Sequence, residues 1–156
     1  MLKLDTSKWN RSRNARMKRH ERLLRQYCCK HGGTTFANAV LDGDPYPHPR
    51  RTDGIRFSYG PPRLISWPRR DPEEFEELLH RAQRDILPVE AIEVTPWESS
   101  RYEVGQVEVA GWLLERLRVK PVMVIVCGEA NPRLNKFLRK HGIRLCAQGK
   151  RATRAD

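Results

Sequence analysis

Long apolar runs are missing from this chain of 156 residues, of which only 38% are hydrophobic. The most apolar stretch, residues 122–126, falls far short of the roughly 18 residues that a membrane span needs, so a transmembrane protein is excluded. The first residues also lack the apolar segment of a secretory signal. We therefore expect a cytoplasmic protein with no membrane partner. A transit peptide stays an alternative, because the N-terminal segment is rich in Arg and poor in acids.

Familiar catalytic and ligand-binding motifs are absent as well. The sequence has no Gly-rich phosphate loop, no Ser or Cys nucleophile beside a recognisable His partner, and no internal repeat. Its four cysteines have no regular spacing, which argues against a disulfide scaffold and for reduced thiols. The nearest approach to a zinc site combines His20, Cys28, Cys29 and His31. Adjacent cysteines fit the spaced ligand pairs of structural zinc poorly, so we do not expect zinc.

Acidic residues are scarce at both ends of the chain, which has a formal charge of +11. Residues 1–30 carry ten Lys and Arg against two acids, and residues 131–156 carry eight against one. Residues 31–130 are mildly acidic, with 12 basic and 16 acidic residues. A basic excess of this size attracts polyanions by releasing their counterions, so DNA or RNA is the expected partner. The alternative is that the charge serves solubility alone.

The first half of the chain predicts one helix and two short strands. Residues 6–30 read as a basic helix with a sparse apolar stripe, ended by Gly32 and Gly33, which we expect on the surface or on a partner. We treat residues 1–33 as an N-terminal arm. Six prolines between residues 41 and 70 limit regular structure to strands over 54–59 and 63–67, joined as a loose hairpin.

The second half predicts alternating helices and strands. Apolar residues at helical spacing, including Phe75 and Ile86, predict an amphipathic helix over 72–86. The elements expected after it are a strand over 89–95 closed by Pro96, a helix from the capping box of Ser100 and Glu103 to about Arg118, a strand over 122–126, a helix from Pro132 to Gly142 that buries Leu134, Phe137 and Leu138, and a strand over 143–146. This order predicts an α/β domain over 34–147, with a mixed sheet flanked by helices, and a disordered basic tail over 148–156.

The strand over 89–95 carries the most informative polar residues. Residues two apart on a strand point to the same face, so Glu93 and Thr95 face together while Ile92 and Val94 face the core. Nucleases hold a divalent metal through hard oxygen ligands at such a strand end, where the metal activates water and neutralises the charge on the scissile phosphate. The alternative is that Glu93 is an ordinary exposed acid.

Residues 89–147 resemble the PD-(D/E)XK, or restriction-endonuclease-like, nuclease superfamily. In that family a strand ending in Glu-x-Lys precedes a helix that often carries a Gln, then an apolar strand, a helix and a short strand. Glu93-Val94-Thr95, Gln106, the apolar segment 121–126 and the segment 137–143 follow this order. The resemblance implies a Mg²⁺- or Mn²⁺-dependent phosphodiesterase with Glu93 as a metal ligand and Gln106 near the site.

One departure from the family pattern is serious, because Thr95 stands where the family has a lysine. Either another cation, Arg101 or Lys120, replaces it, or the domain binds nucleic acid without cutting. The resemblance also implies an upstream metal-binding acid. Asp53 is the first candidate for it and Asp85 the second, since Asp85 leaves no room for a hairpin before Glu93.

Basic residues at both ends of the chain are the candidate nucleic-acid contacts. The set consists of Arg11, Arg13, Arg16, Lys18, Arg19, Arg22, Arg101, Lys136, Arg139 and Lys140. The aromatic residues that could stack on bases are Trp9, Tyr27, Tyr59, Trp67 and Trp97, although packing is the simpler role for Trp67 and for Trp112. The competing function is a non-catalytic subunit of a nucleoprotein assembly, ribosomal, phage or transposon, in which the basic ends order on binding and other proteins are further partners.

Overall fold

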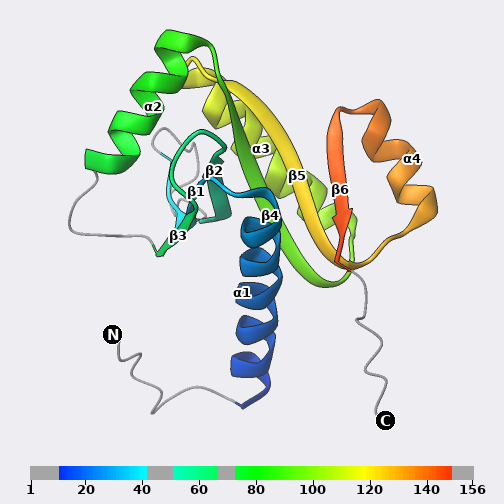
Figure 1. Ribbon diagram of the computed structural model, residues 1–156. Coiled ribbons are helices and arrows are strands. Elements are labelled where there is room, and N and C mark those ends of the chain that lie inside the picture. The colour runs from blue at the N-terminus through cyan, green and yellow to red at the C-terminus, as the bar shows by residue number, and fades with distance from the viewer. Residues whose placement is uncertain (1–10, 42–50, 67–72, 149–156) are drawn as a thin grey trace.

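The computed structural model describes residues 11–41, 51–66 and 73–148, and for residues 11–17 only the backbone. These residues form four helices and six strands (Figure 1). In chain order they are α1 (Arg11–His31), β1 (Thr34–Ala39), β2 (Thr52–Phe57), β3 (Arg63–Ser66), α2 (Glu73–Asp85), β4 (Pro88–Glu98), α3 (Arg101–Arg116), β5 (Lys120–Glu129), α4 (Pro132–Lys140) and β6 (Ile143–Ala147). The predicted α/β class with a mixed sheet is confirmed. Within the described ranges, no helix is both long and apolar enough to cross a bilayer.

All six strands of the described ranges join one sheet, in the order β3-β1-β2-β4-β5-β6. β2 lies antiparallel to both β1 and β4, while β4, β5 and β6 run parallel to one another. Parallel neighbours need a crossover connection, which α3 and α4 provide. The carboxyl ends of β4, β5 and β6 therefore meet at one end of the sheet, and the N-terminal half of α1 projects past that same end (Figure 1).

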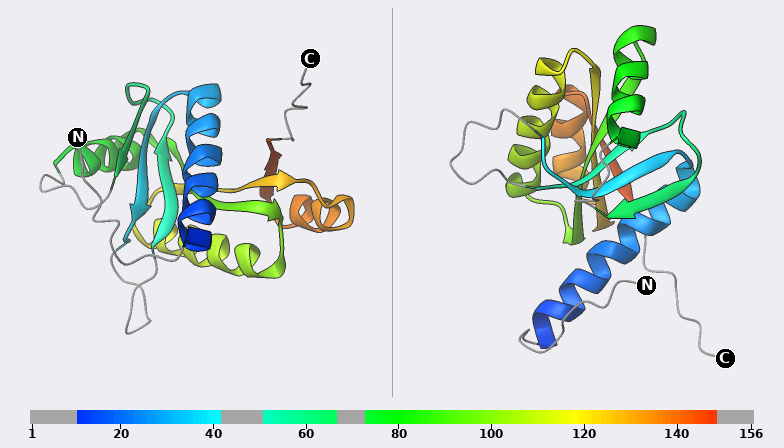
Figure 2. Two further views of the ribbon diagram at one scale, coloured as in Figure 1. Left: turned by 90° about the horizontal axis from the view of Figure 1, so that it is seen from below. Right: turned by 90° about the vertical axis from the view of Figure 1, so that its left-hand side faces the viewer.

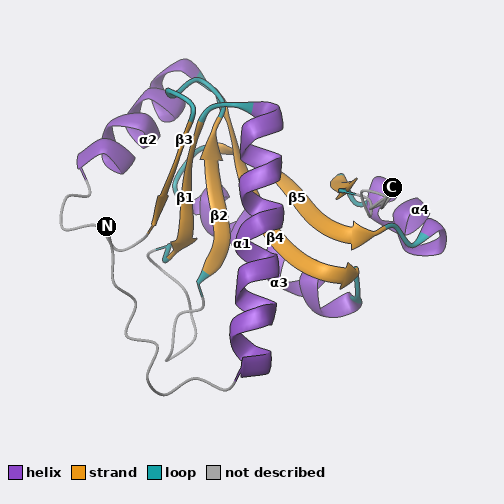
Figure 3. Cartoon of the chain, turned by 60° about the horizontal axis from the view of Figure 1, so that its bottom comes forward, coloured by secondary structure: helices purple, strands orange, loops and turns teal. Residues whose placement is uncertain are grey.

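The helices cover the sheet unequally. α1 crosses one face, where Leu24, Tyr27 and Cys28 pack against Ile92 and Val94 of β4 (Figure 3). α2, α3 and α4 cover the opposite face (Figure 2). The sheet is therefore buried on both sides along its centre, and residues 89–95 of β4 are all buried.

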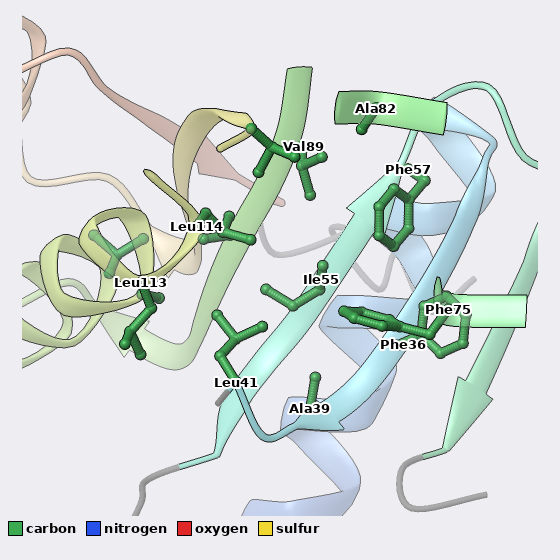
Figure 4. Packing of buried hydrophobic residues seen from close by; sticks show 14 of the residues in the cluster. Phe36, Ala39, Leu41, Ile55, Phe57, Phe75, Ala82, Val89, Leu113 and Leu114 are labelled. Carbon is green, nitrogen blue, oxygen red and sulfur yellow. The ribbon is translucent and has the colours of Figure 1, made fainter. Parts of the chain in front are cut away.

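Aromatic and branched aliphatic residues fill the core on the face covered by α2 and α3 (Figure 4). Phe36 of β1, Phe57 of β2 and Phe75 of α2 meet edge to face, with ring centroids 5.1–6.0 Å apart. Gly111 of α3 permits a close approach, because a Cβ there would lie 2.9 Å from the Met123 Sδ of β5. Packing of these core residues thus holds β2 and β4 together beneath α3.

The N-terminal third of the sheet differs from the sequence prediction. β1 was not expected at all, and it separates β3 from β2 by pairing with both. The predicted hairpin between the strands near 54–59 and 63–67 is therefore wrong, since β3 runs parallel to β1 instead. The sequence of β1 gives little indication of a strand. Five of its six residues are buried, on both faces of the sheet, so no polar face alternates with an apolar one.

Other differences concern single residues. Ile86 is 78% exposed rather than part of the helical face, because it follows the end of α2 with a left-handed φ of +54°. Phe137 of α4 is also exposed and stacks on His141 rather than entering the core. α1 ends at His31, just before the two glycines as expected, but its C-terminal half packs on the sheet rather than on the surface. The predicted tail lies outside the described residues from position 149 onward.

Candidate functional site: a carboxylate pair on adjacent strands

β4 separates its polar residues between two faces. Ile92 and Val94 pack beneath α1, while Glu93 and Thr95 point to the face that carries α3, as the alternation predicts. Glu93 is only 3% exposed, so the alternative of an ordinary exposed acid is wrong. Pro96 does not close the strand, which continues to Glu98 after a register shift beyond Thr95.

Asp53 of β2 lies directly beside Glu93. Gly54 pairs with Ile92 in the antiparallel ladder, so the preceding Asp53 faces Glu93 across the two strands. The Asp53 Oδ2 accepts a hydrogen bond of 2.7 Å from the backbone N–H of Val94. The two carboxyl groups are hydrogen-bonded to each other, and the Asp53 backbone N–H also donates to Glu93. The fold thus joins two acids that are 40 positions apart in the sequence.

Proton binding by this pair is strongly perturbed. Burial, followed by the charge and the hydrogen bond of Asp53, raises the pKa of Glu93 to about 9. Burial also raises the pKa of Asp53, against the opposing effects of the Val94 N–H and of His20 on α1. Two carboxylates in contact cannot both ionise cheaply, so near pH 7 the pair retains a proton.

The start of α3 adds a further negative charge near the pair. Glu103 raises the pKa of both Asp53 and Glu93 through its charge, while its own carboxylate accepts from the Ser100 N–H (2.8 Å) and the Ser100 hydroxyl (2.5 Å). This is the capping box that the sequence predicts. The spacing of residues in the sequence does not show that Glu103 lies near Asp53 and Glu93. No group of three potential metal-ligating side chains occurs among the described residues.

The turn before α3 holds a polar atom with an unfilled hydrogen bond. The Ser99 hydroxyl is buried and has no hydrogen-bond partner within the described part of the chain. The Ser99 backbone interacts with Cys127, which pairs in register with Thr95. This hydroxyl therefore belongs to the same end of β4 as the carboxylate pair.

The other predicted catalytic residues are distributed unevenly around the pair. Thr95 is buried on the same face as Glu93, whereas the Gln106 amide of α3 donates to the Tyr102 hydroxyl at 3.2 Å. Lys120 pairs with Pro88 at the other end of β4, about 16 Å along the strand from Glu93. Lys120 therefore cannot replace the family lysine, and exposed Arg101, at the start of α3, stays the candidate.

Asp85 is not part of the site. It is exposed at the end of α2, near the start of β4, and its carboxylate binds Arg84 at 2.8 Å and Arg81 at 3.8 Å. These arginines and a hydrogen bond from Arg84 lower the pKa of Asp85. Asp53 is thus the upstream acid that the fold brings to Glu93.

The candidate nucleic-acid contacts lie on three helices. Those with described side chains are all exposed: Lys18, Arg19, Arg22, Arg101, Lys136, Arg139 and Lys140. The side chains of Arg11, Arg13 and Arg16, together with Trp9 and Trp67, lie outside the described residues. The Arg19 guanidinium sits 5.0 Å from the centre of the Trp97 ring, which joins α1 to the end of β4.

Sequence reasoning missed a second polar cluster, on the α1 face of the sheet. The Glu90 carboxylate accepts from Arg56 at 2.7 Å, from the Tyr27 hydroxyl at 3.0 Å and from Arg144 at 3.3 Å. Burial and Glu90 raise the pKa of Tyr27, which is a core residue and not a base-stacking one. The available signal was a charge between apolar neighbours, Ile55-Arg56-Phe57 and Val89-Glu90-Ala91.

Two of the four cysteines are buried in the core. Cys28 is buried on α1, where its Sγ donates to the Thr35 hydroxyl, while the adjacent Cys29 is exposed. Cys127 is buried on β5, and burial raises its pKa to about 11. All four thiols are free, as predicted.

No family model, curated protein or solved structure matches the chain.

Proposed function

We propose that this protein is a metal-dependent phosphodiesterase acting on nucleic acid, with Asp53 and Glu93 as its metal ligands. The observation that carries the proposal is the contact between these two acids, which the fold brings together from adjacent strands. Their position supports it further, because the basic exposed side of α1 and the start of α3 lie at the same end of β4. The element order from β4 to β6 also follows the order expected for the PD-(D/E)XK superfamily.

The chemistry of the pair suits a hard divalent cation. Mg²⁺ and Mn²⁺ prefer oxygen ligands and take one or two carboxylates together with water and phosphate oxygens. Within the described residues no Lys or Arg forms an ion pair with Asp53 or Glu93, so a shared proton, backbone N–H groups and His20 are what offsets their negative charge. When bound, such a metal would lower the pKa of a water and neutralise charge on the phosphate.

Each nearby side chain has a defined role in this proposal. Glu93 must give up its proton before it can act as a ligand, and the Val94 N–H holds the Asp53 oxygen in position. Thr95 offers a hydroxyl but no positive charge, so Arg101 supplies the cation that steadies the scissile phosphate. Lys18 and Arg22 attract the phosphate backbone toward the pair.

Cleavage of labelled DNA and RNA with Mg²⁺ or Mn²⁺ tests the proposal directly. We expect the native protein to cut at least one of them. Glu93→Gln should lower the cleavage rate by a factor of about 100 or more, the size of effect that follows the loss of one electrostatic contact in an active site. Glu98→Gln is the matched control, because Glu98 is an exposed acid on the same strand. Equal cleavage by the Glu93 and Glu98 variants would remove Glu93 from the mechanism.

Metal binding gives a second measurement that does not depend on catalysis. Because the pKa of Glu93 is about 9, binding of Mn²⁺ should release close to one proton near pH 7.5. Titration calorimetry in buffers of different ionisation enthalpy measures this release. We expect the apparent affinity to rise about tenfold per pH unit between roughly pH 6 and 9. A pH-independent affinity, or one unchanged in Glu93→Gln, contradicts the assignment.

A second function is favoured by Thr95 and by the burial of Glu93. Without the family lysine and with Glu93 only 3% exposed, the same fold would serve as a non-catalytic subunit of a nucleoprotein assembly. This function predicts binding that weakens steeply with salt and no metal-dependent cutting by the native protein. The cleavage assay therefore separates the two functions.

A further inference from the structure

Two large aromatic side chains are exposed where β4 passes into α3. Trp97 is 56% exposed and Tyr102 is 59% exposed. Trp97 lies four residues beyond Glu93, about 13 Å along the strand, and Tyr102 lies in the first turn of α3. Trp and Tyr are enriched at interfaces because each joins a large apolar ring to a polar group, so exposed aromatic residues beside a candidate site are candidate ligand contacts.

The charges around Trp97 indicate what kind of ligand fits. Arg19 lies over the indole, and Lys18 and Arg22 are exposed beside Arg19 on α1. On the other side, Glu98 pairs in register with Glu129 at the ends of β4 and β5. A polyanionic backbone would therefore approach the pair along the cations of α1 and away from Glu98 and Glu129, with its bases beside Trp97.

We infer that Trp97 is a stacking site for an unpaired base of the nucleic acid that reaches the carboxylate pair. An indole can stack only on a base whose face is not covered by its neighbours, so the preferred substrate has a single-stranded segment at this position. The inference rests on the proposed function, because it names the class of substrate brought to Asp53 and Glu93. The spacing of about 13 Å corresponds to a few nucleotides between the stacked base and the cleaved phosphate.

Trp112 provides a matched control within the same chain. It is 43% exposed and has Arg116 at 5.0 Å from its ring centre, so its local contact resembles that of Trp97. It lies far along α3 rather than at the end of β4, and its arginine belongs to the same helix.

The test is binding of the full-length protein in EDTA, measured by fluorescence anisotropy with a labelled single strand of about 20 nucleotides and with the matching duplex. We expect Trp97→Ala to weaken single-strand binding about tenfold, the loss of one stacked base, while Trp97→Phe loses less and Trp112→Ala changes it less than about twofold. For the duplex, Trp97→Ala should have an effect below about twofold. DNA and RNA strands are compared in parallel.

Equal effects of Trp97→Ala and Trp112→Ala, or an equal loss on single strand and duplex, would overturn the inference. Because EDTA removes any metal, this result is independent of catalysis. Selective single-strand binding without cleavage would support the stacking site and contradict the nuclease function. Cleavage that is insensitive to Trp97 substitutions would support the nuclease function and contradict the stacking site.

Discussion

Glu90 and Glu93 are buried glutamates three positions apart on β4, and they are treated in opposite ways by the fold. Glu90 faces α1, where Arg56, Tyr27 and Arg144 all donate to its carboxylate. Glu93 faces α3, where its nearest polar neighbour is another acid, Asp53. The first arrangement neutralises the charge of Glu90. The second places two buried acids in contact, where they cannot both ionise at low cost.

The difference shows how structural and functional acids can be told apart on one strand. A buried ion pair that is fully hydrogen-bonded holds elements in register. A buried acid whose pKa is raised by burial and by a neighbouring acid lowers stability at a pH where it ionises, and such perturbed acids are typical of functional sites. Three substitutions test this distinction.

The largest effect is expected from Glu90→Gln. The change leaves the Arg56 guanidinium buried without its counter-charge, which should lower the free energy of unfolding by about 3–5 kcal/mol. Urea denaturation of native and variant protein at pH 7 measures it. A loss no greater than that of an exposed substitution such as Glu98→Gln would mean that the cluster does not hold the fold together.

The same substitution at position 93 should have the opposite sign. The raised pKa means that folded Glu93 keeps its proton up to about pH 9, while the unfolded glutamate loses it above about 4.5. Between these values the unfolded state binds fewer protons, so stability of the native protein falls as the pH rises. Gln resembles the protonated acid, and we expect Glu93→Gln to be more stable by on the order of 2 kcal/mol at pH 8.

Measuring denaturation of both proteins from pH 4 to pH 9 separates the titration of the Asp53–Glu93 pair from that of groups elsewhere in the chain. The difference in free energy between Glu93→Gln and the native protein should be near zero at pH 4 and grow toward pH 9. A difference that does not change with pH would show that Glu93 titrates normally.

The smallest effect is expected from Arg144→Gln. Arg144 contacts Glu90 at 3.3 Å, but its side chain is about half exposed. Solvent screens such a pair, so the cost should stay within about 0.5 kcal/mol in the same denaturation assay. A loss as large as that of Glu90→Gln would mean that Arg144, rather than Arg56, provides most of the stabilisation of the Glu90 carboxylate.

Much of the second half of the chain could be predicted from its sequence. The capping box at Ser100, the proline after Asn131 and the apolar segment of β5 are local signals, and α3, α4 and β5 lie where these signals predict them. The face shared by Glu93 and Thr95 follows from the period of a strand alone. The position of Asp53 ahead of a predicted short strand indicates the acid that lies in β2 beside Glu93.

What could not be predicted depends on pairing between distant segments. The sequence does not show that β1 lies between β2 and β3. Nor does it show that Arg56 contacts Glu90, since each charged residue lies between apolar residues that would suit either face of the sheet. The raised pKa of Glu93 likewise depends on burial beneath α3 and on the register of β2. Exposure of Trp97 follows from the strand running past Pro96, where the prediction ended it.

The docking of α1 has a consequence for synthesis on the ribosome. Arg56 donates to the carbonyls of His31 and Gly32 at the end of α1 as well as to Glu90, so the helix is tied down by residues translated after it. Its apolar partners on β4 and β5 emerge later still. The N-terminal helix therefore cannot complete its docking until more than half of the chain has been made, and in that interval its apolar face stays without its partners on the sheet.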